Sequence, residues 1–176
     1  LELLGNRYLD ILKTNISRRL KNLDQDGKFY NLYKHSVNAF IQYEERNMMA
    51  DENKQKSITI TYAVGGAGAQ KEIGRQIALS LSKKIQEEEV KLNLVAGTRT
   101  EIRDYFSRVK EDITGNNKNV QIIYAEDNES YFDLFNQCLQ TTDILWTKPS
   151  ELSFYCALGL PVIINGLDAK QDTDGG

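Results

Sequence analysis

The sequence has 176 residues, of which 40% are hydrophobic and 27% charged, and its formal net charge is −3. These values are close to the globular average and argue against a disordered, collagen-like or coiled-coil chain, and the weakly acidic balance gives no electrostatic reason to expect nucleic acid as a partner. The single histidine, His35, excludes a multi-histidine zinc site and a Ser–His triad near the C-terminal motifs.

No segment approaches the roughly 20 apolar residues that a membrane-spanning helix needs, and no signal-peptide pattern is present. We therefore expect a cytoplasmic protein without a transmembrane segment. The two cysteines, Cys138 and Cys156, fit no metal-ligand spacing, and we expect both to be reduced, buried thiols. The sequence begins with Leu1 rather than Met, and from this we expect a part of a longer protein.

Residues 1–56 are expected to form a helical linker or appendage. Apolar residues recur at spacings of three and four over 29–41, which predicts an amphipathic helix. A weaker version of the pattern covers 9–16, residues 24–27 separate the two, and a polar linker follows. We expect these helices to pack against a neighbouring domain, with His35 on a solvated face.

From residue 57 onward, strand-like and helix-like patterns alternate. Apolar, β-branched runs predict five strands, at 58–64, 91–96, 120–124, 143–146 and 161–165. Apolar residues at four-residue spacing predict a helix at 73–85, apolar residues on one side predict another at 101–110, and helices are also predicted at 131–138 and 151–158. The alternation predicts an α/β fold: a Rossmann-like parallel sheet of about five strands, with helices on both faces, over residues 57–176.

The turn Gly65-Gly66-Ala67-Gly68 joins the first predicted strand to the following helix, at the sheet edge where such folds bind ligands. Glycines let an anion approach the backbone, and the free N–H groups of a helix N-terminus attract phosphate. The turn lacks the Gly-x-Gly-x-x-Gly pattern and the Gly-Lys-Ser/Thr ending of a P-loop. A purely structural tight turn therefore remains an alternative.

The loop after the fourth predicted strand also carries candidate ligand-binding residues. Pro149 makes the turn rigid, and Ser150 is a plausible N-cap of the next helix. Lys148 can offer a positive charge to phosphate, and Glu151 can accept hydrogen bonds from sugar hydroxyls. Without a ligand, Lys148 is a solvated loop lysine, and Glu151 is favourable in a first helical turn.

Together these motifs resemble a known family. The first strand with its Gly-Gly-Ala-Gly-Ala turn, and the later stretch Thr-Asp-Ile-Leu-Trp-Thr-Lys-Pro…Ala-Leu-Gly-Leu-Pro-Val-Ile-Ile, resemble the C-terminal nucleotide-sugar-binding domain of GT-B glycosyltransferases. They are most similar to the lipid-II-forming N-acetylglucosaminyltransferases and the diacylglycerol glycosyltransferases. The resemblance covers residues 57 to about 172.

The resemblance implies a metal-independent glycosyltransferase that transfers a hexose from a UDP-sugar. It implies no cofactor, since the UDP-sugar is the substrate, and an acceptor that is a lipid or a glycan. In the family the catalytic base is usually supplied by an N-terminal acceptor domain, which this sequence does not contain. Catalytic residues are therefore left unassigned.

The resemblance also implies a set of nucleotide-sugar-binding residues in five segments. The glycine turn would face the diphosphate and the transferred sugar. The loop after the second strand would border the nucleotide, and the loop after the third strand would hold the uracil. The Thr-Lys-Pro loop would border ribose and phosphates, and a final Gln-Asp pair would contact sugar hydroxyls. The residues are Gly65, Gly66, Gly68, Gly97, Thr98, Arg99, Tyr124, Ala125, Glu126, Lys148, Ser150, Glu151, Gln171 and Asp172.

Other functions stay open. The family usually has Gly-Gly-Leu-Thr after the Thr-Lys-Pro motif, whereas this chain has Ser-Glu-Leu-Ser at 150–153. This departure favours the alternative of a catalytically inactive GT-B-like module that binds a nucleotide or a partner. A GT-B-type epimerase or another Rossmann-like enzyme is a third possibility. A dehydrogenase is disfavoured, because residues 97–99 lack the acidic residue that reads the NAD ribose.

Overall fold

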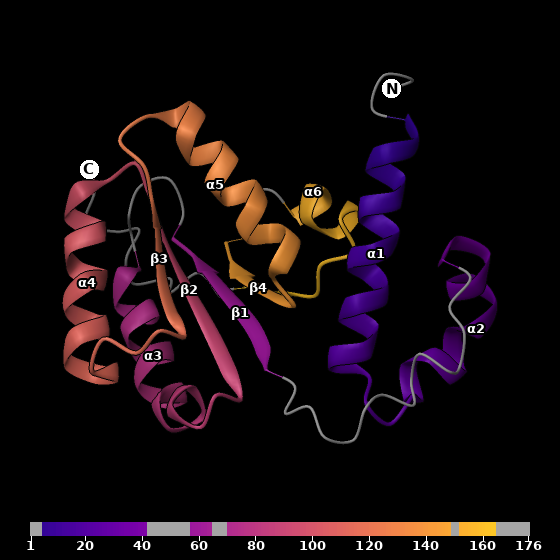
Figure 1. The fold of residues 1–176 in the computed structure, drawn as a ribbon, viewed down its shortest axis with the longest axis horizontal. Helices are drawn as coiled ribbons and strands as arrows, with labels where there is room; N and C mark the ends of the chain where they lie inside the picture. Colours follow the sequence, from indigo (N-terminus) through magenta and orange to yellow (C-terminus); the bar gives the residue numbers. More distant parts are fainter. Residues whose placement is uncertain (1–4, 42–56, 65–69, 149–151, 165–176) are drawn as a thin grey trace, which may run out of the picture.

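A computed structural model describes residues 5–41, 57–64, 70–148 and 152–164 (Figure 1). The elements are α1 (Gly5–Leu23), α2 (Lys28–Ile41), β1 (Ile58–Ala63), α3 (Lys71–Gln86), β2 (Val90–Gly97), α4 (Thr100–Thr114), β3 (Val120–Tyr124), α5 (Asn128–Thr141), β4 (Ile144–Thr147), α6 (Leu152–Ala157) and β5 (Val162–Ile164). All strand pairs are parallel, and the sheet order is β3-β2-β1-β4-β5. The Rossmann-like α/β prediction is confirmed.

Two apolar clusters hold helices to the two faces of the sheet. On one face, α3 and α4 pack on the first three strands around Leu92, Leu94 and Phe106, which are fully buried. On the other face, α5 and α6 pack around Leu145 and Phe135. Strands that are covered on both faces are mainly apolar on both, although Thr59, Thr61 and Asn93 place buried polar side chains in β1 and β2.

Capping groups decide where the helices begin and end. The carboxylate of Asp127 accepts a hydrogen bond from the backbone N–H of Ser130 at 2.9 Å, so α5 begins at Asn128, three residues before the predicted start. Gly115 adopts the left-handed conformation with φ of 60° and ends α4 at Thr114, four residues after the predicted end. The first turn of α5 is polar and escapes a prediction from apolar spacing, whereas Ile113 continues the apolar spacing of α4 beyond the predicted end.

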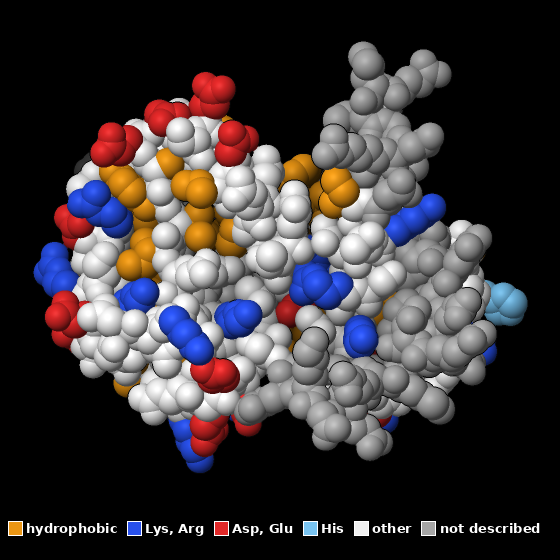
Figure 2. Space-filling model, viewed as in Figure 1, with side chains coloured by type: hydrophobic (Ala, Val, Ile, Leu, Met, Phe, Trp, Pro, Cys, Tyr) orange, Lys and Arg blue, Asp and Glu red, His pale blue; other side chains and the backbone are white. Residues whose placement is uncertain are grey.

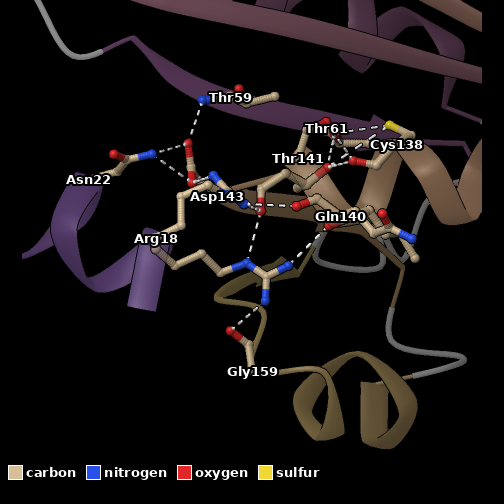
Figure 3. Close-up of polar contacts among 12 residues, drawn as sticks. Arg18, Asn22, Thr59, Thr61, Cys138, Gln140, Thr141, Asp143 and Gly159 are labelled. Atoms are coloured by element: carbon tan, nitrogen blue, oxygen red, sulfur yellow. Dashed lines mark hydrogen bonds and ion pairs between the residues drawn. The ribbon is translucent and has the colours of Figure 1, made fainter. Parts of the chain in front are cut away.

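α1 is joined to the α/β unit through Asp143, whose side chain is buried just before β4 (Figure 3). The carboxylate forms an ion pair with Arg18 and accepts hydrogen bonds from Asn22 at 3.1 and 3.2 Å. It also accepts the backbone N–H of Thr59 in β1 at 2.9 Å. One carboxylate therefore connects α1, β1 and the start of β4. We refer to Arg18, Arg19, Asn22 and Asp143 as the α1 clamp.

Arg19 supplies the second part of the α1 clamp. Its buried guanidinium donates to the backbone carbonyls of Thr142 at 2.9 Å, Leu158 at 2.7 Å and Leu139 at 3.0 Å. These carbonyls lie in or after α5 and at the end of α6, where helices leave carbonyl groups unpaired. Burial lowers the pKa of Arg19 to about 10, so it stays protonated at neutral pH.

α2 begins where the carboxylate of Asp24 accepts the backbone N–H groups of Phe29 at 2.9 Å and Tyr30 at 2.8 Å. Tyr30 is buried, whereas Phe29 and Tyr33 remain half exposed, and their rings contact one another at a tilt of 42°. His35 is exposed, as the sequence predicted. None of the helices in the described ranges is long and apolar enough to cross a membrane.

The two cysteines have different environments. Cys138 of α5 is buried beside Thr61 and Asn93, and burial raises the pKa of its thiol. The prediction that both thiols are buried is wrong for Cys156, which is exposed on α6. The neighbouring Tyr155 takes the inward position on this short helix, and consecutive residues of a helix point in different directions.

We predict that the Arg18→Ala substitution lowers the free energy of unfolding by about 3 kcal/mol or more, because it leaves the buried Asp143 carboxylate without its ion-pair partner. Urea unfolding followed by circular dichroism measures the change. The control, Lys28→Ala, breaks a solvent-exposed pair with Asp26 and should leave stability nearly unchanged. Equal effects of the two variants would contradict the assigned role of the α1 clamp.

We also predict that only one of the two thiols reacts with a disulfide reagent in the native protein. The exposed Cys156 should react at once, whereas Cys138 is shielded and its raised pKa reduces the thiolate fraction. Both should react after denaturation. The Cys156→Ser variant should abolish the native reaction, and rapid labelling of that variant would show that Cys138 is accessible.

Candidate functional site

The strand order places the ends of β1 and β4 side by side, at the point where the order of the strands in the sheet reverses. Chain connections run from β1 outward to β2 and β3, and then back to β4 on the other side of β1. In open α/β sheets, ligands bind at the carboxyl ends of the strands at this switch point. In the sequence the glycine-rich segment follows β1 and Lys148 follows β4, and the ends of these two strands lie side by side at one edge of the sheet.

Described residues fix the two ends of the glycine-rich segment. Tyr62, the penultimate residue of β1, is buried and donates its hydroxyl to the backbone carbonyl of Gln70 at 2.7 Å. Gln70 adopts the left-handed conformation with φ of 72° immediately before α3. The end of the strand and the start of the helix are therefore held together by a side chain from the core.

Gly74, in the first turns of α3, allows this helix to approach the sheet closely. A Cβ atom at this position would lie 2.7 Å from Cε1 of Phe106 and 3.0 Å from Cδ1 of Tyr62. Both rings are fully buried, so they have little room to move. Any larger residue would push the start of α3 away from the carboxyl end of β1.

Lys148 follows the last residue of β4 and is half-buried. Thr147 donates its hydroxyl to the backbone carbonyl of Ala63 at 3.4 Å, which joins the end of β4 to the end of β1. Among the residues that the structure describes, Lys148 has no ion-pair partner. Its positive charge is thus uncompensated at the switch point.

The loops after β2 and β3 are joined to each other. Gly97 adopts a left-handed conformation with φ of 67°, and its carbonyl accepts the backbone N–H of Ala125 at 3.2 Å. Thr98 is half-buried, whereas Arg99 is exposed and its guanidinium lies 3.6 Å from the carboxylate of Glu101. The structure therefore brings together the two predicted nucleotide-bordering loops, although Arg99 already has an acidic neighbour.

Tyr124 is held on both sides of its ring. Its hydroxyl lies 3.1 Å from the hydroxyl of Thr100, and the guanidinium of Arg103 stacks 4.8 Å from the ring centroid. Arg103 also donates two hydrogen bonds to Asp104, at 2.9 and 2.7 Å, which raise the pKa of the arginine. The half-buried ring also packs against the core cluster between the sheet and α4, so it is held in one position beside Ala125.

The charges differ between the two halves of this edge. Three acidic residues, Glu126, Asp127 and Glu129, follow β3 and are exposed. Figure 2 shows acidic side chains along the upper rim of the left-hand part of the molecule, which contains the sheet. Hydrogen bonds from Ser130 lower the pKa of Asp127, which is therefore ionised at neutral pH. Because like charges repel, a phosphate group is disfavoured at the β3 end and favoured near Lys148.

The structure describes half of the predicted site residues. Gly97, Thr98, Arg99, Tyr124, Ala125, Glu126 and Lys148 all lie at the carboxyl ends of their strands, on one edge of the sheet. The predicted residues that lie outside the described ranges are Gly65, Gly66, Gly68, Ser150, Glu151, Gln171 and Asp172. Their roles stay predictions.

Sequence reasoning missed Gly74 and Arg103, which shape this edge. Gly74 gave no signal by itself, because its role depends on Phe106, which is 32 residues away in the sequence and meets it only in the fold. Arg103 had a weak signal, since it lies one turn after the start of a predicted helix that follows the second strand.

Comparison with known proteins adds no relative. No family model, no curated protein and no solved structure matches this chain. Within the described ranges, no group of three or more His, Cys, Asp or Glu side chains could hold a metal ion. The function must therefore be argued from the geometry above.

We predict that Gly74→Ala destabilises the protein by about 1–2 kcal/mol, because the added methyl group overlaps the Phe106 ring and this cost exceeds the gain in helix propensity. Thermal and urea unfolding measure the loss. The control, Ser80→Ala on the exposed side of α3, should change stability by less than about 0.5 kcal/mol. A stabilised Gly74→Ala variant would contradict the close approach of α3.

Proposed function

We propose that this chain binds the UDP-sugar donor of a metal-independent GT-B glycosyltransferase, as the half of that enzyme that holds the nucleotide. The observation that carries the proposal is the switch point between β1 and β4, where the glycine-rich segment and the uncompensated charge of Lys148 follow adjacent strand ends. This is where open α/β sheets bind nucleotides, with phosphate against the following helix N-terminus.

The distribution of charge gives the nucleotide a direction in the proposed site. The diphosphate would lie near Lys148, away from the acidic rim after β3. The uracil and ribose would lie toward Ala125 and the ring of Tyr124, which Arg103 and Thr100 hold in place. Backbone groups at 97 and 125 are already hydrogen-bonded to one another, so this part of the site is preorganised.

In the proposed reaction, the acceptor hydroxyl displaces UDP from the anomeric carbon of the sugar. Negative charge then develops on the leaving diphosphate, and Lys148 and backbone N–H groups would stabilise it without a metal. The acceptor, a lipid or a glycan, and the base that removes its proton would be held by an N-terminal domain. The proposal assigns no catalytic base to this chain.

We predict that UDP, but not ADP, GDP or NAD, raises the melting midpoint of this chain. A ligand at about 100 times its Kd stabilises the native state by ~2.7 kcal/mol, which for a chain of this size is a shift of roughly 5 to 10 °C. Differential scanning fluorimetry measures the shift. Lys148→Ala should remove most of it, whereas Lys83→Ala, on the exposed surface of α3, should retain it.

The possible outcomes separate the alternatives. A shift with NAD alone would contradict the glycosyltransferase proposal. No shift with any of the four nucleotides would contradict donor binding and favour a GT-B-like module that binds a partner. A UDP shift that survives Lys148→Ala would show that the diphosphate lies elsewhere.

A further inference from the structure

The sheet face covered by α5 is polar toward the amino ends of its strands. Thr59 of β1 is in register with Lys91 of β2, and Asn93 of β2 is in register with Gln121 of β3. Register partners in parallel strands, and alternate residues along one strand, point to the same face, so these four side chains share a surface. This surface faces α5, because the side-chain amide of Asn93 lies 3.3 Å from Sγ of Cys138, a residue of α5. Parallel strands are ordinarily apolar on both faces. Here Asn93 is bonded to Thr61 and Cys138 within the core, whereas Lys91 and Gln121 are exposed.

A cavity of about 640 Å³ lies over this polar surface. The four strand residues form its floor, and Thr141, the last residue of α5, forms part of its wall. We refer to this cavity as the amino-edge groove. Its volume is in the range of sites that bind small molecules. Figure 2 shows both Lys or Arg and Asp or Glu side chains over the lower half of the part of the molecule that contains the sheet.

Several polar groups of the amino-edge groove have no partner among the residues that the structure describes. The Oγ atom of Ser57 is buried and makes no hydrogen bond to any of them, which is a costly state unless another group supplies one. Within the described ranges, the ammonium group of Lys91 makes no ion pair and the exposed amide of Gln121 makes no hydrogen bond. The groove thus offers a hydroxyl, a cation and an amide from three separate segments.

The net charge of the amino-edge groove is positive. Lys118 lies on its rim and pairs with Glu88 at 2.8 Å, and this hydrogen bond lowers the pKa of Glu88 and keeps it ionised. The charges of this pair cancel, so Lys91 provides one excess positive charge. A single cation among amides and hydroxyls suits a small ligand that carries both an anionic group and hydroxyl groups.

We propose that the amino-edge groove binds a small polyhydroxylated anion, such as a phosphorylated or carboxylated sugar. Lys91 meets the anionic group, and Ser57 and Gln121 hydrogen-bond to the hydroxyls. The groove lies at the amino ends of the strands, whereas the proposed nucleotide site lies at their carboxyl ends. The two proposals therefore stand or fall independently.

Isothermal titration calorimetry at low ionic strength tests this with four probes: glucose 6-phosphate, gluconate, glucose and inorganic phosphate. At least one of the two hydroxylated anions should bind saturably and about tenfold more tightly than glucose or phosphate. Which of the two binds distinguishes a phosphate ester from a carboxylate. Lys91→Ala should weaken this binding by about tenfold and Gln121→Ala by a few-fold, because each removes a ligand-directed group. Arg108→Ala removes one charge from α4, on the opposite face of the sheet, and should bind as the parent does.

The proposal is overturned if neither anion binds saturably up to about 10 mM, or if inorganic phosphate alone binds as tightly as the hydroxylated anions. It is also overturned if Lys91→Ala and Gln121→Ala both bind the anion as the parent does. A fourth contrary result is that UDP displaces the bound anion and that Lys148→Ala no longer binds it. The last result would place the ligand at the carboxyl edge. All variants are checked by circular dichroism, and since Lys91 and Gln121 are exposed, each should fold.

Discussion

The buried carboxylate of Asp143 determines how the helical segment and the sheet are joined. Taking a carboxylate out of water is costly unless a cation and hydrogen-bond donors replace the solvent, and Arg18, Asn22 and the backbone N–H of Thr59 do so here. The cation comes from α1, and the backbone donor comes from β1. The carboxylate therefore requires both to be in place, and β4, which starts beside it, is positioned by the same contact. Since Lys148 lies at the other end of this four-residue strand, the contact that fixes β4 also fixes the cation of the proposed nucleotide site.

The two ends of the sheet have different chemistry although they share the same strands. At the carboxyl ends, Gly97, an aromatic ring and a lysine that has no ion-pair partner among the described residues lie beside exposed acidic residues. At the amino ends, polar side chains replace the apolar residues that a doubly covered sheet would carry. Each end therefore departs from the composition that packing alone favours, and such departures are common where proteins bind ligands.

Much of the fold follows from local pattern. The strand at 120–124 is predicted to the residue, because its apolar run is bounded by polar turns on both sides. The α1 clamp could not be predicted, since Asp143 and Arg18 are 125 residues apart and neither has a distinctive neighbourhood in the sequence. The exposure of Cys156 depends on which side of a six-residue helix faces the core. A helix of this length has too few turns for the spacing of apolar residues to identify its buried side. At the candidate site, the segments were predictable from the strand ends, whereas the pairing of Arg103 with Tyr124 depends on how α4 packs beside β3.

The sequence distance across the α1 clamp has a consequence for synthesis on the ribosome. Arg19 of α1 is made about 120 residues before the carbonyl groups of Leu139 and Thr142 that it bonds. At translation rates of 5–20 residues per second, roughly 6 to 25 seconds separate the helix from its partners. During that interval the nascent α1 has neither the carboxylate nor the carbonyls that accept its two arginines. Docking of the first helix is therefore a late event, and the last elements of the sheet complete the environment of the first.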